Sequence, residues 1–411
     1  MLNGYRIIDI TDDKGLFCGK LLADLGAEVV KVERPGGDPA RMVGPFYHDE
    51  HHPDRSLFWF DFCQGKKGIT LDLEKPRGRE LLKALVAKAD AVVESFPPGH
   101  LDSLGLGYDA LKAVNPSLVF TSITPFGGTG PYANYKGPDI VAMAMSGYMS
   151  LCGDTDRPPV RVGYPITYPI ASAEAAAGTV MALFHRGRTG QGQRVDVSGQ
   201  QASVSLGANA PAFWDINRRL IGRSGQFRGE LLAAVKERQV WPCKDGFISF
   251  AIYGGDTGAR VNKALVEWID SEGMADDFLR GIDWKALDMA TVTRDFMEPV
   301  EERLGAFFLT HTKEEMLKGA LERRLILLPV YDLGDILSDP QLQSRGYWME
   351  VEHPELGGSL TYPGPFIQSR PAPVQPGRRA PLVGEHNREV YSQWLGLSPE
   401  QVEALKQEGV I

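Results

Sequence analysis

Apolar and polar residues alternate along the first 124 positions in a way that predicts strands separated by helices. Short runs rich in β-branched residues predict buried strands at residues 5–11, 28–36, 68–73, 90–96 and 117–124. Apolar residues at helical spacing predict helices at 19–27, 76–89 and 109–116. This alternation is typical of an α/β domain with a doubly wound, Rossmann-like parallel sheet.

The segment after the first predicted strand lacks the glycine pattern that binds dinucleotide phosphates. It reads TDDKGLF (residues 11–17), where a dinucleotide-binding domain carries GxGxxG. The pattern therefore predicts the topology of such a domain without its usual cofactor.

The rest of the chain predicts a smaller domain followed by a return to mixed structure. A helix, a glycine-rich turn, a strand and a further helix are expected between residues 178 and 206. Residues 239–253 predict a hairpin that turns at Lys244-Asp245-Gly246. Charge-mixed helical sequence follows, and we expect residues 225–325 to form a small α+β domain. Near the end, Ser398 and Gln401 predict a capping box at the start of a helix.

Composition narrows the class of protein. The 411 residues are 43% hydrophobic and 24% charged, which indicates a globular chain of two domains. A net charge of −9 argues against nucleic acid as a partner. We expect no membrane association, because the start resembles no signal peptide and no apolar run approaches ~18 residues. The four cysteines are widely spaced, which favours free thiols in the cytoplasm over disulfides or zinc.

Several motifs in one order resemble the family III CoA-transferases, the group that contains formyl-CoA transferase and carnitine CoA-transferase. They are LLADLGAEVVKVERPGGDPAR, GKKGITLDL, ADAVVESFPPG, LGLGYDALKAVNPSLVFTSIT, GTGPY, TGQGQRVDVS, DILSDPQLQSRG and APLVGEH. The resemblance implies a large α/β domain from both chain ends, here residues 1–224 and 326–411, around the small domain. It also implies two interlocked subunits with active sites at their contacts, acyl-CoA as substrate, and no covalently bound cofactor.

One position departs from the family in a way that bears on catalysis. In the family an aspartate attacks the acyl-CoA thioester and forms a mixed anhydride, then an aspartyl-CoA thioester. Counting five residues on from Gly163, or ten back from Gly178, places Tyr168 at that position. A phenol, with its pKa near 10, forms no such anhydride. We therefore expect no catalytic residue of this kind. Glu174, six residues on, is either a replacement nucleophile or a helix-surface residue.

Other positions of the expected site are partly changed. A residual CoA site is expected at Lys14, Arg34, Lys66, Phe96, Lys136 and Asp139. Glu74 and Ser103 stand where the family has basic partners for the CoA phosphates, and Asp12, Asp13, Ser95 and Gln201 also depart from its pattern. The related α-methylacyl-CoA racemases need a histidine before an aspartate, but here proline precedes Asp139, so racemisation is not expected.

Two further clusters have a structural and a functional interpretation. Residues 48–52, HDEHH, form either a solvated loop, which we favour, or a metal site, and we expect no metal. The aromatic group Phe58, Trp59, Phe60 and Phe62 is either packing at a domain or subunit contact, which we favour, or part of an acyl pocket.

Together these features predict a subunit that keeps the transferase fold without its own nucleophile. The partner would be a homologous catalytic subunit, interlocked with this chain as a heterodimer or larger assembly. The nearest resemblance is to the heteromeric succinyl-CoA:benzylsuccinate CoA-transferases of anaerobic toluene degradation, which implies a carboxylic acid such as an aromatic dicarboxylate as acceptor. Two alternatives stay open: a homodimeric acyl-CoA transferase or isomerase that uses another residue, and a non-catalytic acyl-CoA-binding protein.

Overall fold

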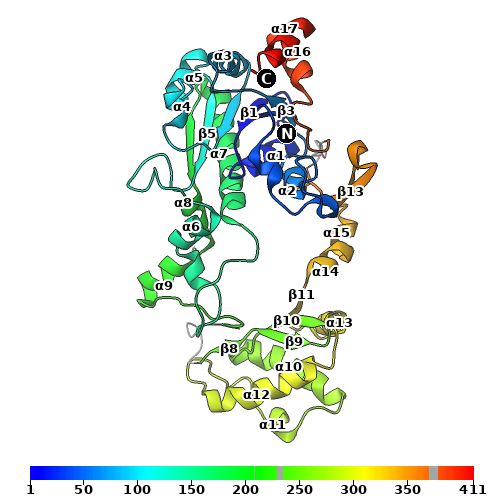
Figure 1. The fold of residues 1–411 in the computed structure, drawn as a ribbon. Coiled ribbons are helices and arrows are strands. Elements are labelled where there is room, and N and C mark those ends of the chain that lie inside the picture. The colour runs from blue at the N-terminus through cyan, green and yellow to red at the C-terminus, as the bar shows by residue number, and fades with distance from the viewer. Residues whose placement is uncertain (208, 229–234, 370–377) are drawn as a thin grey trace. The chain divides into compact units, whose positions relative to one another are not determined.

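The computed structural model describes residues 1–207, 209–228, 235–369 and 378–411. The chain divides into two compact units (Figure 1). The first comprises residues 1–146, 162–207 and 343–411, and the second comprises residues 147–161 and 208–342. The domain boundaries expected from the sequence, at 224/225 and 325/326, stay a prediction.

A six-stranded parallel sheet forms the centre of the first unit, in the order β3-β2-β1-β4-β5-β6. Its strands are β1 (Arg6–Ile10), β2 (Glu28–Glu33), β3 (Lys67–Thr70), β4 (Ala91–Glu94), β5 (Val119–Thr124) and β6 (Arg194–Ser198). The order reverses between β1 and β4, as in a doubly wound sheet. The predicted α/β fold is confirmed, with the expected second strand ending at Glu33 rather than at 36.

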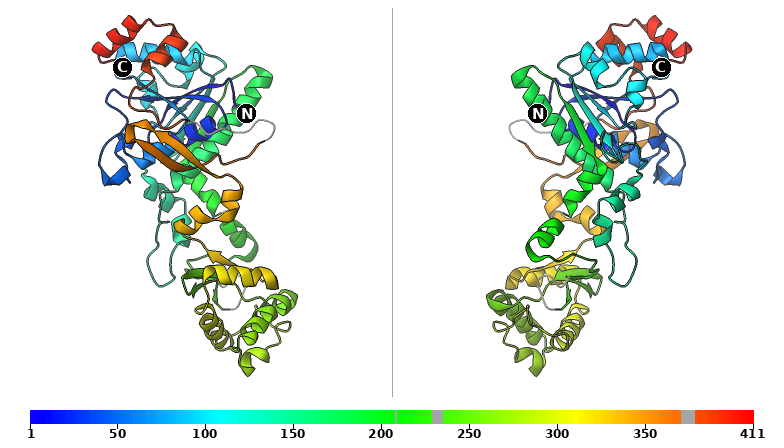
Figure 2. Two further views of the ribbon diagram at one scale, coloured as in Figure 1. Left: turned by 90° about the vertical axis from the view of Figure 1, so that its right-hand side faces the viewer. Right: turned by 90° about the vertical axis from the view of Figure 1, so that its left-hand side faces the viewer.

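Helices cover both faces of this sheet (Figure 2). Neighbouring strand residues point to opposite faces, so Ile7 packs in one hydrophobic cluster and Ile8 in another. The Ile8 side holds α3 (Pro76–Val86), α4 (His100–Ser103), α5 (Tyr108–Val114), α16 (Asn387–Leu395) and α17 (Pro399–Gln407). The Ile7 side holds α1 (Leu16–Asp24), α7 (Thr167–Thr189) and α8 (Gly199–Leu206).

The end of the chain therefore packs onto the sheet that its beginning forms. Tyr391 of α16 is buried, and its hydroxyl donates to the carbonyl of Thr70 at 2.8 Å. Ser398 and Gln401 form the predicted capping box at the start of α17. The union of both chain ends in one unit matches the architecture that the family resemblance implies.

Short elements complete the first unit around the carboxyl ends of the strands. They are η1 (Pro39–Met42), η2 (Tyr47–Asp49), α2 (Leu57–Phe62), α6 (Asp139–Met145), β12 (Trp348–His353), η4 (Pro354–Leu356) and β13 (Gly358–Pro363). β12 and β13 pair antiparallel. α15 (Pro340–Ser344) spans the residues where the chain passes between the units.

The second unit has its own core around a three-stranded antiparallel sheet, β11-β10-β9. Its elements are η3 (Tyr148–Leu151), α9 (Asn209–Asn217), β7 (Phe227–Arg228), β8 (Glu237–Arg238), β9 (Val240–Cys243), β10 (Gly246–Phe250), α10 (Gly255–Ser271), α11 (Asp277–Arg280), α12 (Arg294–Phe308), α13 (Lys313–Arg323), β11 (Leu327–Val330) and α14 (Leu333–Ser338). β9 and β10 form the predicted hairpin, with Cys243 opposite Gly246. Among the described residues, no helix combines the length and the apolar character needed to cross a membrane.

Candidate functional site

The loops at the carboxyl ends of β1, β4 and β5 surround a cavity of about 580 Å³ in the first unit. We call it the central cavity. Its wall comes from residues 12–14 after β1, 95–98 after β4, 133–139 before α6, and 164–169 at the start of α7. In doubly wound sheets, ligands bind at this edge, where the strand order reverses. The volume is in the range of small-molecule sites.

Tyr168 lies in this cavity wall, in the first turn of α7. Its side chain is 6% exposed, and its hydroxyl donates to the carbonyl of Gly137. Burial raises the pKa of the Tyr168 phenol well above its ordinary value, and the charges of Asp12, Asp13 and Asp139 raise it further. The phenol is therefore neutral at physiological pH and engaged as a donor, so it is unsuited to nucleophilic attack.

Most of the charged groups around the cavity are already paired. The ammonium of Lys14 pairs with the carboxylate of Asp12 and lies 3.8 Å from an oxygen of Asp13. The hydroxyl of Ser95 donates to Asp12 at 2.6 Å. Lys136 is exposed and forms no ion pair with any described residue. Among the described residues of the wall, Lys136 is thus the cation without an ion pair, while the three carboxylates outnumber the two ammonium groups.

Asp139 occupies the amino ends of two helices. It is the first residue of α6, and its Oδ1 accepts from the backbone N–H of Thr167, the first residue of α7, at 2.8 Å. Its Oδ2 is buried and has no hydrogen-bond partner within the described structure. The amino ends of α6 and α7 are the positive ends of their helix dipoles, and both lie beside the Asp139 carboxylate.

The aromatic group on α2 packs in the core, and two of its rings also line the cavity. Phe58 and Phe62, four residues apart and so on one helix face, line the cavity with ring centroids 4.5 Å apart. Trp59 and Phe60 pack in a hydrophobic cluster of the first unit, to which Phe62 also belongs and against which Phe58 packs. Tyr135 and Tyr164 add two further rings to the cavity wall.

A second cavity of about 420 Å³ adjoins the first and shares Asp12, Ser95, Phe96 and Pro97 with it. We call it the strand-end cavity, because the carboxyl ends of β1, β2 and β3 line it. Its further charged residues are Glu33, Arg34, Asp38, Asp72 and Glu74. Arg41 pairs with Glu33 at 2.6 Å, and Lys31 pairs with Asp38 at 3.1 Å. Asp72, Glu74 and Arg34 have no ion pair within the described residues, so two negative charges and one positive charge are unpaired in this cavity wall.

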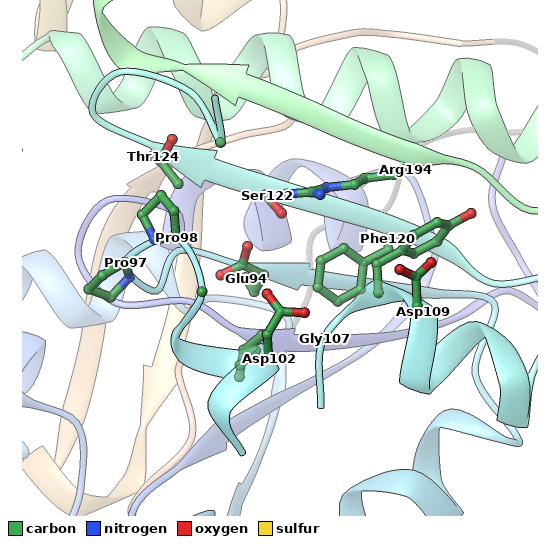
Figure 3. Close-up of a pocket in the computed structure, with 14 residues that line it drawn as sticks. Glu94, Pro97, Pro98, Asp102, Gly107, Asp109, Phe120, Ser122, Thr124 and Arg194 are labelled. Atoms are coloured by element: carbon green, nitrogen blue, oxygen red, sulfur yellow. The ribbon is translucent and has the colours of Figure 1, made fainter. Parts of the chain in front are cut away.

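A third, small cavity of about 70 Å³ lies beside β4 and β5 (Figure 3). Figure 3 shows the carboxyl groups of Glu94 and Asp102 directed into the same space, with Arg194 of β6 extending over Ser122. Burial raises the pKa of Glu94 to about 7. The Glu94 Oε2 accepts from the backbone N–H of Phe96 at 2.7 Å, and Phe96 lines both larger cavities. Sequence reasoning did not single out Glu94, because only its burial distinguishes it from other glutamates.

Comparison with known proteins agrees with this arrangement. Residues 2–387 match CoA-transferase family III. The chain belongs to this family. It is 36% identical to the succinyl-CoA:(R)-benzylsuccinate CoA-transferase subunit BbsE of Thauera aromatica, over 94% of this chain and 92% of the relative. It is 32% identical to the succinyl-CoA–D-citramalate CoA-transferase of Chloroflexus aurantiacus, over 97% and 94%. A CAIB/BAIF family protein from Brucella suis has the same fold, with a TM-score of 0.81, 27% identity and coverage of 96% and 99%.

The structure brings together most of the family III residues that the sequence singled out. Lys14, Phe96, Lys136 and Asp139 line the central cavity with Tyr168. Arg34 lines the strand-end cavity, where its Nε donates to the carbonyl of Gly37 at 3.1 Å.

Lys66 is an exception to this grouping. Its ammonium is fully buried, 2.8 Å from Asp9 and 2.7 Å from the carbonyl of Leu16. No ligand in either cavity reaches it, and we leave it out of the proposed site.

The structure also shows where the alternative nucleophile, Ser103 and the histidines of residues 48–52 lie. Glu174 is exposed on α7, where its carboxylate accepts from Ser205 at 3.4 Å, and it does not line the central cavity. Ser103 is exposed on α4, and its hydroxyl donates to the carbonyl of His100 at 2.7 Å. His48, His51 and His52 are exposed. The described residues contain no cluster of histidine, cysteine and acidic side chains able to hold a metal ion.

Proposed function

We propose that this chain is the aspartate-less subunit of a heteromeric CoA-transferase. The enzyme moves CoA from an acyl-CoA, succinyl-CoA in the first place, to a carboxylic acid such as an aromatic dicarboxylate. Its partner is a homologous family III subunit that carries the aspartate and interlocks with this chain in the cytoplasm. The name of the relative from Thauera aromatica describes a subunit and a benzylsuccinate substrate. The names of both relatives given above include succinyl-CoA.

The observation that carries the proposal is Tyr168 at the position of the nucleophile. Transfer requires an enzyme group that becomes an acyl group, and only a carboxylate gives the anhydride and then the thioester. The Tyr168 hydroxyl is occupied by the carbonyl of Gly137, and its pKa is raised by burial and nearby carboxylates. Glu174 is no substitute, because it is exposed outside the cavity. The chain then serves a structural or regulatory role beside the homologous catalytic subunit.

The strand-end cavity supports the same conclusion. Asp72 and Glu74 add negative charge to its wall, which disfavours phosphate binding there. We infer that this chain holds CoA weakly and that the productive CoA site belongs to the partner.

The test compares the full chain alone with the chain co-expressed with a family III protein that carries the aspartate. CoA transfer from succinyl-CoA to benzylsuccinate is followed by chromatography of the thioesters. We expect no turnover by the lone chain, turnover by the complex, and loss of turnover when the partner's aspartate becomes alanine. Tyr168→Phe in this chain is the matched control and should leave the rate of the complex within about twofold.

Turnover by the lone chain would refute the proposal in favour of a homodimeric enzyme. Glu174→Gln would then test the alternative nucleophile. A lone chain that binds acyl-CoA tightly and forms no complex with any family III partner would instead favour the acyl-CoA-binding protein.

A further inference from the structure

One face of α7 carries five residues in a row that no part of the described structure covers. We call this row the α7 seam; it consists of Glu174, Ala177, Met181, Phe184 and Arg188, all of them exposed. Met181 is 66% exposed and Phe184 is 67% exposed, whereas the opposite face of α7 packs in a hydrophobic cluster on the sheet. Large apolar side chains gathered on one exposed helix face indicate an interaction surface.

The spacing of the α7 seam is typical of a helix that pairs with another helix. Successive members are three, four, three and four residues apart, so the pattern repeats every seven residues. An α-helix drifts by only about 20° over seven residues, so Glu174, Met181 and Arg188 stay on one face. The same spacing places the contact residues of coiled coils. The seam therefore fits a second helix rather than a loop or a small molecule.

The ends of the seam carry opposite charges, and these charges select the partner. Glu174 lies seven residues before Met181, and Arg188 lies seven residues after it. When two copies of α7 lie antiparallel with their Met181 side chains in contact, Glu174 of each copy lies opposite Arg188 of the other. Phe184 then lies beside Ala177 of the other copy, whose small side chain leaves room for the ring. The seam is thus complementary to itself about a two-fold axis, the commonest symmetry of paired identical chains.

Both charged groups at the ends of the seam are available for this contact. Neither Glu174 nor Arg188 forms an ion pair with a described residue, and Glu174 accepts from Ser205 at 3.4 Å. The Arg188 guanidinium lies over the Phe184 ring, 5.7 Å from its centre, and so already lies on the seam. A parallel pair of helices would place like charges opposite each other, which is unfavourable. The charges therefore favour the antiparallel arrangement.

We propose that α7 pairs antiparallel with α7 of a second copy of this chain, through the seam from Glu174 to Arg188. The inference goes beyond the proposed function, because this pairing needs no catalytic partner. In the heteromeric enzyme the same contact joins two heterodimers into one larger assembly.

Disulfide cross-linking tests the pairing at its centre. Met181→Cys in the full-length chain places a thiol beside the two-fold axis, where the thiols of two copies come within bonding distance. Mild oxidation should convert this variant into a covalent dimer on non-reducing electrophoresis. Lys88→Cys, at an exposed residue outside the seam, is the matched control and should remain without a cross-link. Equal cross-linking of the two variants would overturn the proposal.

Charge reversal tests the antiparallel register. Arg188→Glu turns two attractions per pair into two repulsions, so it should weaken self-association about tenfold in sedimentation equilibrium. Glu174→Arg should weaken self-association by a similar factor, and Lys88→Glu should leave it unchanged. A mixture of the two weakened variants should recover the wild-type association, because one copy then supplies two carboxylates and the other two guanidinium groups. A mixture that associates no better than either variant alone would refute the register.

The outcomes separate this inference from the proposed function. Cross-linking of Met181→Cys to a co-expressed catalytic subunit, in place of its own copy, would overturn the proposal. Absence of the cross-link in a complex that transfers CoA would refute this inference alone. A cross-linked pair in a complex that transfers no CoA would refute the proposed function and still support the pairing through α7.

Discussion

Glu94→Gln is expected to stabilise the protein in a pH-dependent manner. Glu94 is 6% exposed at the end of β4, and burial raises its pKa from 4.5 to about 7. Because the folded-state pKa exceeds the unfolded one, the contribution of Glu94 to stability is fully present below pH 4.5. It declines as pH rises and is lost once the pH passes about 7.

The size of the effect follows from the two pKa values. The interval from 4.5 to about 7, at about 1.36 kcal/mol per pH unit, corresponds to about 3 kcal/mol of unfolding free energy. Glutamine stays neutral at every pH, and its carbonyl can still accept from the N–H of Phe96. The variant should therefore gain up to about 3 kcal/mol on the wild type between pH 4.5 and pH 8.

Urea denaturation of both proteins between pH 4.5 and pH 8 measures this gain, since other titrating groups cancel in the difference. Glu403→Gln is the matched control, because Glu403 is exposed on α17 and forms no ion pair with a described residue. It should show the wild-type pH dependence. If Glu94→Gln also follows the wild type throughout, Glu94 titrates as an ordinary surface carboxyl and the reasoning from its burial is wrong.

Three other outcomes are expected. Tyr168→Asp, assayed beside a partner whose aspartate is alanine, should give less than about 1% of normal CoA transfer. Asp12, Asp13 and Asp139 would oppose ionisation of a fourth carboxylate, and misplacement of the reacting group by ~1 Å already costs about a hundredfold in rate. Substantial turnover would show that only the nucleophile is missing. Sedimentation of the isolated chain should show self-association or poor solubility, since interlocked subunits bury well over ~2,000 Å²; a stable monomer would contradict the interlocked assembly. Calorimetry should find CoA binding weaker than micromolar, because Glu74 and Ser103 stand in place of two phosphate partners worth about 1.5–3 kcal/mol each. Glu74→Lys should strengthen CoA binding. Micromolar CoA binding by the wild type would count against the inference that this chain holds CoA weakly.

Local pattern alone determined the central sheet, whereas the position of the missing nucleophile is predicted from the family resemblance. Runs of β-branched residues around Ile7, Val30 and Val92 form buried strands wherever helices flank them, so the alternation is readable without contacts. The spacing of Gly163, Tyr168 and Gly178 is likewise a property of the chain itself. The sheet is confirmed because strands and helices depend on neighbours in sequence, and the role of position 168 stays a prediction.

Tertiary structure decided which charged groups remain available to a ligand. Lys66 was expected in the residual CoA site, yet the fold buries its ammonium against Asp9, 57 positions earlier in the chain. Glu94 looked ordinary, yet burial among residues from β5, β6 and α4 raises its pKa to about 7. Lys136 is distinguished only because it has no ion pair with any described residue, while Lys14 pairs with Asp12 and lies near Asp13. Desolvation and pairing depend on segments far apart in sequence, so they are properties of the folded chain and not of any local pattern.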